Sequence, residues 1–221
     1  MDKDTLDQLI KCPKCFGTLI STRESNICND CNTVYYNNHN GQPKFIEESL
    51  YDDNEDYEHI LSVSKYWDAG WRKRNEEEHV SFLNLNTKEI HDNAKKQKKE
   101  LGKSGVGNLL GNEINFKTLD KKIGVNIGSG TGAEASYLMA LGNANIIAID
   151  VTAEATRTSK EIIDKLGIGR AIQADARHLP IEKSSIDFVY SSGVLHHSRN
   201  IEQSINQIYR ILKPNGVAYI A

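Results

Sequence analysis

The segment from Val125 to Asp150, VNIGSGTGAEASYLMALGNANIIAID, constrains the fold more strongly than any other part of the chain. Gly128, Gly130 and Gly132 follow a β-branched run directly and precede a segment rich in alanine and leucine. A second apolar run then ends on Asp150. This order predicts a strand, a tight glycine loop, a helix and a second strand, with backbone N–H groups of the loop facing a ligand.

The pattern continues to the end of the chain. Predicted strands cover 123–127, 146–149, 171–173, 188–191 and 217–221, and predicted helices cover 132–141, 153–166 and 200–212. Strands that alternate with helices at this spacing predict an α/β fold with a doubly wound, mostly parallel sheet.

Four cysteines form two CxxC pairs near the N-terminus, Cys12 with Cys15 and Cys28 with Cys31. Two such pairs offer four thiolates, which Zn²⁺ binds in a tetrahedron, and an all-cysteine shell leaves no open position for catalysis. We therefore expect a structural zinc in a small zinc-ribbon-like domain over residues 1–46. The alternatives are free or disulfide-bonded cysteines, or His39 as a competing ligand.

The bulk composition excludes several classes of protein. The chain is 38% apolar and 26% charged with a net charge of −3, which gives no overall reason for a polyanionic partner. No apolar stretch approaches the ~18 residues of a membrane span, and the N-terminal MDKDTLDQLIK lacks the apolar centre of a signal peptide. We expect a cytoplasmic protein whose cysteines stay reduced.

An acid that closes the strand after a glycine loop lies where it accepts hydrogen bonds from ribose hydroxyls. Asp150 therefore indicates a nucleoside-containing cofactor. The loop GSGTGA fits G-x-G-x-x-G/A loosely, so the loop by itself leaves a nicotinamide dinucleotide open. A glycine-rich turn without any ligand is the other alternative.

Four segments in order, VNIGSGTG, IIAID, AIQADARHLPIEKSSIDFVYSSGVLHH and IYRILKPNG, resemble the class I, Rossmann-like S-adenosylmethionine-dependent methyltransferases. The resemblance covers about residues 121–221. It implies an enzyme that transfers a methyl group from S-adenosyl-L-methionine to an acceptor, either a small metabolite or RNA. A cofactor without phosphates agrees with the loop, which contains no lysine or arginine.

The resemblance also implies which residues bind the cofactor. Asp150 would accept from the ribose hydroxyls, Asp175 from the adenine amino group, and Asn126 stands where the family usually has an acid near the cofactor's ammonium group. Because asparagine lacks the charge, we expect weaker binding than is usual for the family. The full set is Asn126, Gly128, Ser129, Gly130, Gly132, Asp150, Val151, Asp175, Ala176, Ser191 and Ser192.

His196 and His197 are the catalytic candidates, because histidines at this place in the family commonly lie beside the active site. A histidine has a suitable unperturbed pKa for a general base, although methyl transfer often requires only alignment. Shaping and packing is therefore the alternative role for both. Trp67 and Trp71, four residues apart, fit a buried helix face better than a ligand site.

The remaining expectations concern the whole chain. Residues 47–118 would form a linker and helical lid region, and residues 119–221 the cofactor-binding domain. The cysteine segment resembles zinc ribbons fused to bacterial methyltransferases and small ribbon proteins that activate methylases. Because the family fold normally continues beyond the fifth strand, we expect a sheet truncated there. One consequence that follows is that this form of the chain is inactive. The alternatives are an edge covered by residues 50–118, by a protein partner or in a homodimer, and a non-catalytic cofactor-binding or scaffold module.

Overall fold

The computed structural model describes residues 3–77, 84–101, 114–167 and 169–221. Its centre is a six-stranded sheet in the order β4-β7-β6-β5-β8-β9, and every neighbouring pair is parallel. The strands are β4 (Lys44–Phe45), β5 (Ile123–Ile127), β6 (Asn145–Asp150), β7 (Gly169–Ala174), β8 (Ile186–Ser191) and β9 (Leu212–Ile220). This order confirms the predicted doubly wound α/β fold.

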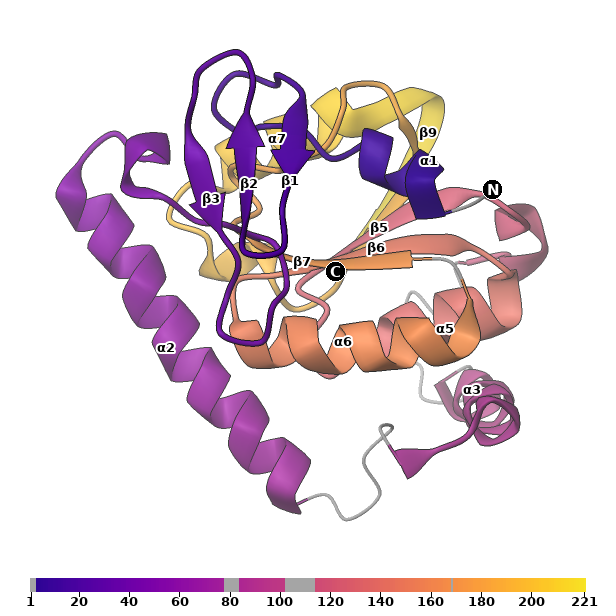
Figure 1. Ribbon diagram of the computed structural model, residues 1–221. Coiled ribbons are helices and arrows are strands. Elements are labelled where there is room, and N and C mark those ends of the chain that lie inside the picture. Colours follow the sequence, from indigo (N-terminus) through magenta and orange to yellow (C-terminus); the bar gives the residue numbers. More distant parts are fainter. Residues whose placement is uncertain (1–2, 78–83, 102–113, 168) are drawn as a thin grey trace.

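Two layers cover the sheet (Figure 1). The helices α5 (Ala133–Gly142) and α6 (Ala153–Leu166) pack on one face. The other face carries α7 (Ile201–Ile211) together with the N-terminal segment, which comprises α1 (Lys3–Gln8) and a separate antiparallel sheet of β1 (Leu19–Ser21), β2 (Ser25–Cys28) and β3 (Val34–Tyr36).

The strand sequences explain this sandwich. All six residues of β6 are buried, as expected for a parallel strand covered on both faces. Ile147 and Ile149 pack in the core beneath the N-terminal segment, whereas Ile146 and Ala148 pack in the core beneath α5 and α6. The alternation follows from the two-residue period of a strand.

Side-chain caps set the beginnings of the helices. Thr152 accepts a hydrogen bond from the N–H of Ala155 and so begins α6, and Asn200 caps α7 through the N–H of Gln203. In α3 (Thr87–Leu101), Asn86 and Glu89 exchange reciprocal bonds with each other's backbone N–H groups, which is a capping box.

The N-terminal segment is joined to the central sheet. Tyr35 of β3 and Phe45 of β4 are fully buried, with ring centroids 5.1 Å apart, and they share one core with residues of β5, β6 and β8. β4 pairs with β7 and so adds a sixth strand that the sequence did not predict. The boundary after residue 46 stays a prediction, but the strand just before it belongs to the large sheet.

The C-terminal edge of the sheet differs from the prediction in one respect. β9 begins directly after α7, so residues 213–216, which separate the predicted helix from the predicted fifth strand, are part of a strand with an irregular register against β8. Within the described ranges, no strand pairs with the outer side of β9. The long helix α2 (Asn54–Glu77) packs on α6, and α3 packs on α5, so these described parts of residues 50–118 lie away from β9. Part of the predicted lid region lies outside the described residues.

None of the helices within the described part of the chain is long and apolar enough to cross a membrane.

Candidate functional site

The four cysteines converge at one end of the ribbon. Their Sγ atoms all lie within 4.8 Å of one another. The Sγ atoms of Cys12 and Cys31 are 3.7 Å apart, and those of Cys15 and Cys28 are 3.4 Å apart. A tetrahedron of ~2.3 Å Zn–S bonds requires Sγ–Sγ distances of roughly 3.8 Å, so these residues fit a single Zn²⁺ ion.

A second feature lies at the carboxyl ends of β5, β6 and β7, where the strand order reverses. It is a cavity of about 320 Å³, and α2 forms its outer wall. Ligands of open α/β sheets bind at this kind of switch point. Eight of the predicted residues line the cavity: Gly128, Gly130, Asp150, Val151, Asp175, Ala176, Ser192 and His197.

The glycine loop adopts the backbone geometry that requires glycine. Gly128, Gly130 and Gly132 have φ angles of 70°, 51° and 82°, which residues with a Cβ rarely adopt. A Cβ on Gly128 would lie 2.0 Å from Val194, and a Cβ on Gly130 would lie 3.1 Å from the ring of Trp71. The loop therefore holds its backbone close to the facing wall.

Asp150 holds the glycine loop in place through hydrogen bonds. Its Oδ2 accepts a hydrogen bond from the N–H of Gly130 at 3.0 Å, and its Oδ1 accepts from the N–H and the hydroxyl of Thr152, both at 2.9 Å. Burial raises the pKa of Asp150, against these hydrogen bonds, which lower it. The carboxylate thus links the loop, the end of β6 and the start of α6.

Asp175 belongs to a buried charge network. Its Oδ2 accepts hydrogen bonds from Nε and Nη2 of Arg177 at 2.9 and 2.7 Å and from the hydroxyl of Tyr51 at 3.3 Å. The Nη1 atom of Arg177 donates to both oxygens of Asp56, in the first turn of α2, at 2.8 Å. Oδ1 of Asp175 accepts one hydrogen bond, from the backbone N–H of Arg177. The network therefore connects α2 to Asp175, the acid predicted to accept a hydrogen bond from the adenine amino group.

Two buried polar atoms near the cavity have no partner within the described residues, namely Oδ1 of Asn126 and the hydroxyl of Ser191. They lie on the paired strands β5 and β8, where Asn126 is opposite Tyr190 and Ile127 is opposite Ser191. Neither residue is among those that line the cavity, but each lies within two positions of one that does, Gly128 and Ser192 respectively. Asn126 was predicted to accept from the cofactor's ammonium group, and its unpaired oxygen is compatible with that role.

The outer wall is aromatic. Trp67 and Trp71 line the cavity and stack with their ring centroids 5.9 Å apart, and the ring of His197 lies 5.6 Å from that of Trp67. The tryptophan pair is half-buried, so it does not form the purely structural helix face favoured by its spacing. Arg74, over the ring of Trp71, and Glu134, whose pKa is raised by burial, complete the wall.

The other predicted residues lie behind the wall or beside it. Ser129 is buried and bonds the hydroxyl of Ser159 on α6, and Gly132 packs against the same residue. His196 is exposed and lies against His197, with ring centroids 4.0 Å apart. Sequence reasoning missed Arg177 and Tyr51, because no local pattern indicates that they reach Asp175.

Residues 125–220 match the family described as a methyltransferase domain. This segment, slightly under half of the chain, is similar to a methyltransferase domain. Among curated proteins, the biotin biosynthesis bifunctional protein of Cellvibrio japonicus is 33% identical over 103 residues, which cover 47% of this chain and 20% of that protein. A malonyl-(acyl-carrier protein) O-methyltransferase of Pectobacterium atrosepticum is 29% identical over 94 residues, 42% of this chain and 36% of that enzyme.

Not every relative of this chain is named for methyl transfer. The mitochondrial arginine-hydroxylase of Mus musculus is 29% identical over 116 residues, 52% of this chain and 33% of that protein. The chain thus spans about a fifth to a third of these three curated relatives. These matches show what residues 125–220 are similar to, and the reaction of the whole protein is a matter for proposal.

A solved structure shares the fold over a larger part of the chain. The complex between the Trm112 methyltransferase activator and a putative methyltransferase of Haloferax volcanii matches with a TM-score of 0.50 and 19% identity. The match covers 72% of this chain and 59% of that one. At this identity the likeness shows the Rossmann-like fold alone.

Proposed function

We propose that the protein binds S-adenosyl-L-methionine in the cavity under α2 and transfers its methyl group to an acceptor. One observation carries the proposal: Asp150, Asp175 and the positive-φ glycine loop, far apart in sequence, line one cavity at the switch point of the sheet. Two acids and bare backbone N–H groups suit a ribose, an adenine and an amino acid.

The bound cofactor would supply an electrophilic methyl group on a sulfonium. Asp150 would accept hydrogen bonds from the ribose hydroxyls, while Oδ1 of Asp175 retains acceptor capacity for the adenine amino group. The backbone of Gly128 and Gly130 would approach the methionine part, above the unpaired oxygen of Asn126. The aromatic wall of Trp67 and Trp71 would exclude water from the reacting atoms.

Of the two histidines, His197 is the better candidate for accepting the acceptor's proton, because it lines the cavity whereas His196 lies beside it. The acceptor class that we propose is a small metabolite or a single RNA group reaching into the cavity. The names of two relatives, for malonyl-acyl carrier and biotin chemistry, support a small acceptor.

We propose that the cysteine ribbon carries a structural Zn²⁺, in keeping with a reducing, cytoplasmic location. The Haloferax volcanii structure pairs a methyltransferase with an activator protein. A protein partner is therefore a reasonable expectation for this chain as well, in addition to its acceptor.

Calorimetry with S-adenosylhomocysteine, the demethylated product, tests the proposal without knowledge of the acceptor. We expect stoichiometric binding, and we expect Asp150→Asn to weaken it by roughly 10- to 100-fold, since hydrogen bonds to charged groups contribute about 1.5–3 kcal/mol. Asp92→Asn, an exposed acid on α3, is the matched control and should bind normally. No binding to the unaltered protein at high micromolar ligand would defeat the proposal, and binding without turnover on any acceptor would favour the non-catalytic module.

A further inference from the structure

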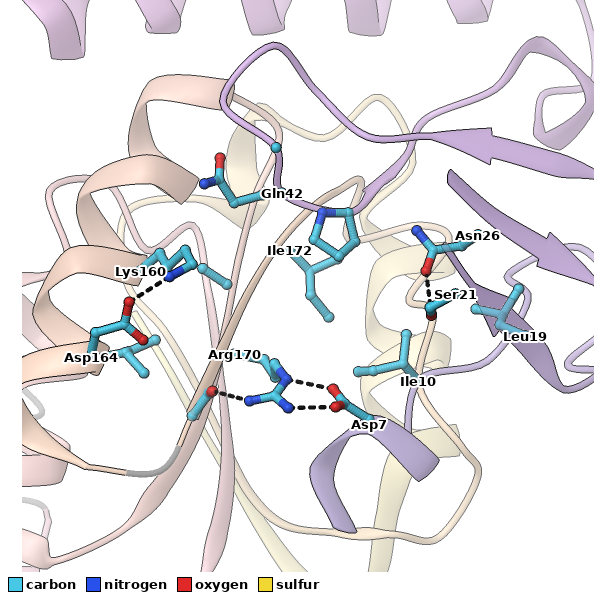
Figure 2. A pocket seen from close by; sticks show the side chains of 15 residues that line it. Asp7, Ile10, Leu19, Ser21, Asn26, Gln42, Lys160, Asp164, Arg170 and Ile172 are labelled. Atoms are coloured by element: carbon cyan, nitrogen blue, oxygen red, sulfur yellow. Dashed lines mark hydrogen bonds and ion pairs between the residues drawn. The ribbon is translucent and has the colours of Figure 1, made fainter. Parts of the chain in front are cut away.

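The outer edge of β7 is only partly paired. β4 has two residues, which pair with Gln173 and Ala174, and no described strand pairs with residues 169–172 on that side. The space beside them is a cavity of about 370 Å³, separate from the cofactor cavity (Figure 2). We call this space the edge slot.

The edge slot lies where the next strand of the sheet would continue. Ile163 of α6 lines it from one layer, and Ile10 and Leu19 line it from the N-terminal layer. Pro43, the residue before β4, also lines it. The slot is therefore an extension of the line of β4, enclosed between the same two layers that cover the sheet.

The backbone of β7 presents a donor and an acceptor to this slot. The N–H of Gln173 donates to the carbonyl of Pro43 at 2.8 Å, so Gln173 faces the β4 side. Because backbone groups of alternate strand residues face the same edge, the N–H and C=O of Ala171 face it too. Ala171 is only 6% exposed, and neither group has a hydrogen-bond partner within the described ranges.

The neighbouring carbonyl is already satisfied. Gly169 faces the same edge, and its C=O accepts a hydrogen bond from Nη1 of Arg170 at 3.0 Å. Arg170 is held in place by a two-pronged ion pair with Asp7, as Figure 2 shows. The backbone pair of Ala171 is therefore the unused hydrogen-bonding unit of the slot, and buried backbone groups of this kind are almost always paired in proteins.

The side chains of the slot narrow the choice of ligand. Its charged groups form two ion pairs, Arg170 with Asp7 and Lys160 with Asp164, so the slot offers no surplus charge to an anionic or cationic ligand. The remaining lining consists of isoleucine, leucine, alanine, proline and glycine, together with the polar side chains of Ser21, Asn26 and Gln42. One more buried acceptor, Oε1 of Gln42, lacks a partner among the described residues.

We propose that the edge slot binds a short extended peptide of a partner protein, which adds to β7 in line with β4. The peptide would donate to the C=O of Ala171 and accept from its N–H, as in other cases of strand addition to a sheet edge. The four unpaired residues of β7 span about 13 Å at ~3.3 Å per residue, which limits the contact to three or four residues. Because the charged lining residues already pair with each other and most of the other lining residues are apolar or glycine, the peptide residues are small and uncharged.

The proposal goes beyond methyl transfer and does not depend on it. A capped peptide, acetyl-Val-Ala-Val-amide, is a direct probe, and ¹H–¹⁵N NMR of the full chain follows its binding. We expect saturable shifts centred on Ala171, with the amide of Gln173 less affected. The matched probe carries an N-methyl group on the central amide and should bind at least about fivefold more weakly, because one hydrogen bond is lost.

Two protein variants separate the slot from the rest of the surface. Ser21→Trp places a large ring at a lining position and should abolish the shifts, whereas Ile20→Trp lies on the neighbouring, 52% exposed position outside the slot and should preserve them. The absence of shifts at Ala171 up to about 10 mM peptide, well above the ~1 mM expected of a weak site, overturns the proposal. Equal binding of the N-methylated probe, or full binding to Ser21→Trp, overturns it as well.

Discussion

At the scale of single residues, the site depends on two acids that the sequence identified and on one arginine that it did not. Asp150 was predicted because it closes the apolar strand after the glycine loop, and Asp175 was predicted from the resemblance to the methyltransferases; both line the cavity. Arg177 lies two residues beyond Asp175, in a stretch with no regular pattern. Its role depends on Asp56, which is 121 residues away in the chain, so no local pattern could predict the contact.

The raised pKa of Asp150 has a consequence for binding. Burial favours the protonated carboxyl, whereas hydrogen bonds from ribose hydroxyls require acceptor oxygens. Affinity for S-adenosylhomocysteine should therefore fall as the pH is lowered toward the raised pKa, which lies above the ordinary value for aspartate. Calorimetry between pH 7.5 and pH 4.5 measures this, and an affinity independent of pH over that range would contradict it.

The pH dependence of stability has the opposite sign to that of affinity: the stability that this carboxyl contributes falls as the pH rises. A carboxyl whose folded-state pKa is raised contributes most to stability below its unfolded pKa, and this contribution is lost as the pH rises through the folded pKa. Asp150→Asn removes the titration. As the pH rises through the raised pKa of Asp150, the variant should therefore gain stability relative to the unaltered protein. Urea unfolding at several pH values would show this.

Arg177→Met should be strongly destabilising. The side chains of Arg177 and Asp175 are 3% and 5% exposed, so the variant leaves buried carboxylates without their cation. Breaking a buried pair in this way costs about 3–5 kcal/mol, measured as the free energy of unfolding in urea. Lys95→Met, which removes an exposed ion pair with Asp92 on α3, is the control and should change stability little. Equal effects of the two variants would refute the importance of the buried network.

At the scale of elements, regular strands and helices were predictable and short or distant ones were not. The bounds of β5 and α6 follow from a continuous apolar run and from the cap at Thr152. β4 has only two residues, Lys44 and Phe45, and becomes a strand because β7 offers it an edge. The wall formed by α2 could not be predicted from helical spacing, which shows that Trp67 and Trp71 share a face but not what that face contacts.

This wall provides an intrinsic signal. The chain has two tryptophans, and both line the cavity. Adding S-adenosylhomocysteine should therefore change the tryptophan fluorescence, and Trp71→Phe should remove most of the change, because the ring of Trp71 lies against Gly130. Trp67→Phe should retain more of it. A ligand that binds by calorimetry without any change in emission would show that α2 does not contact it.

At the scale of the whole molecule, the ribbon and the six-stranded sheet share a core. Cys12, Cys28 and Tyr35 are completely buried in the same cluster as Val125 and Val189. The hydroxyl of Tyr35 lies 3.2 Å from Sγ of Cys12, which connects the cysteine cluster directly to this core. The CxxC spacing predicted the cluster, but it carried no information about the packing beneath it.

Removal of zinc should therefore destabilise the entire protein. Structural zinc contributes on the order of 10 kcal/mol to small domains, and a shared core passes much of that loss to the sheet. After chelation we expect the midpoint of thermal unfolding, followed by the helical circular dichroism signal, to fall by at least about 5–10 °C. Metal analysis should give one zinc per chain before chelation, and adding zinc back should restore the midpoint. An unchanged midpoint after complete zinc removal would disprove this coupling.

The position of β4 also limits how the chain of such a protein can be shortened or recombined during evolution. A shortened chain that started at residue 47 would lose the two residues that shield Gln173 and Ala174, and bare strand edges invite copies of a protein to associate. Recombination that exchanged the cysteine segment for an unrelated one would have the same result. We therefore expect the cysteine segment and the large sheet to stay together in related proteins. Substitutions at Phe45 should be accompanied by substitutions at its neighbours on β7.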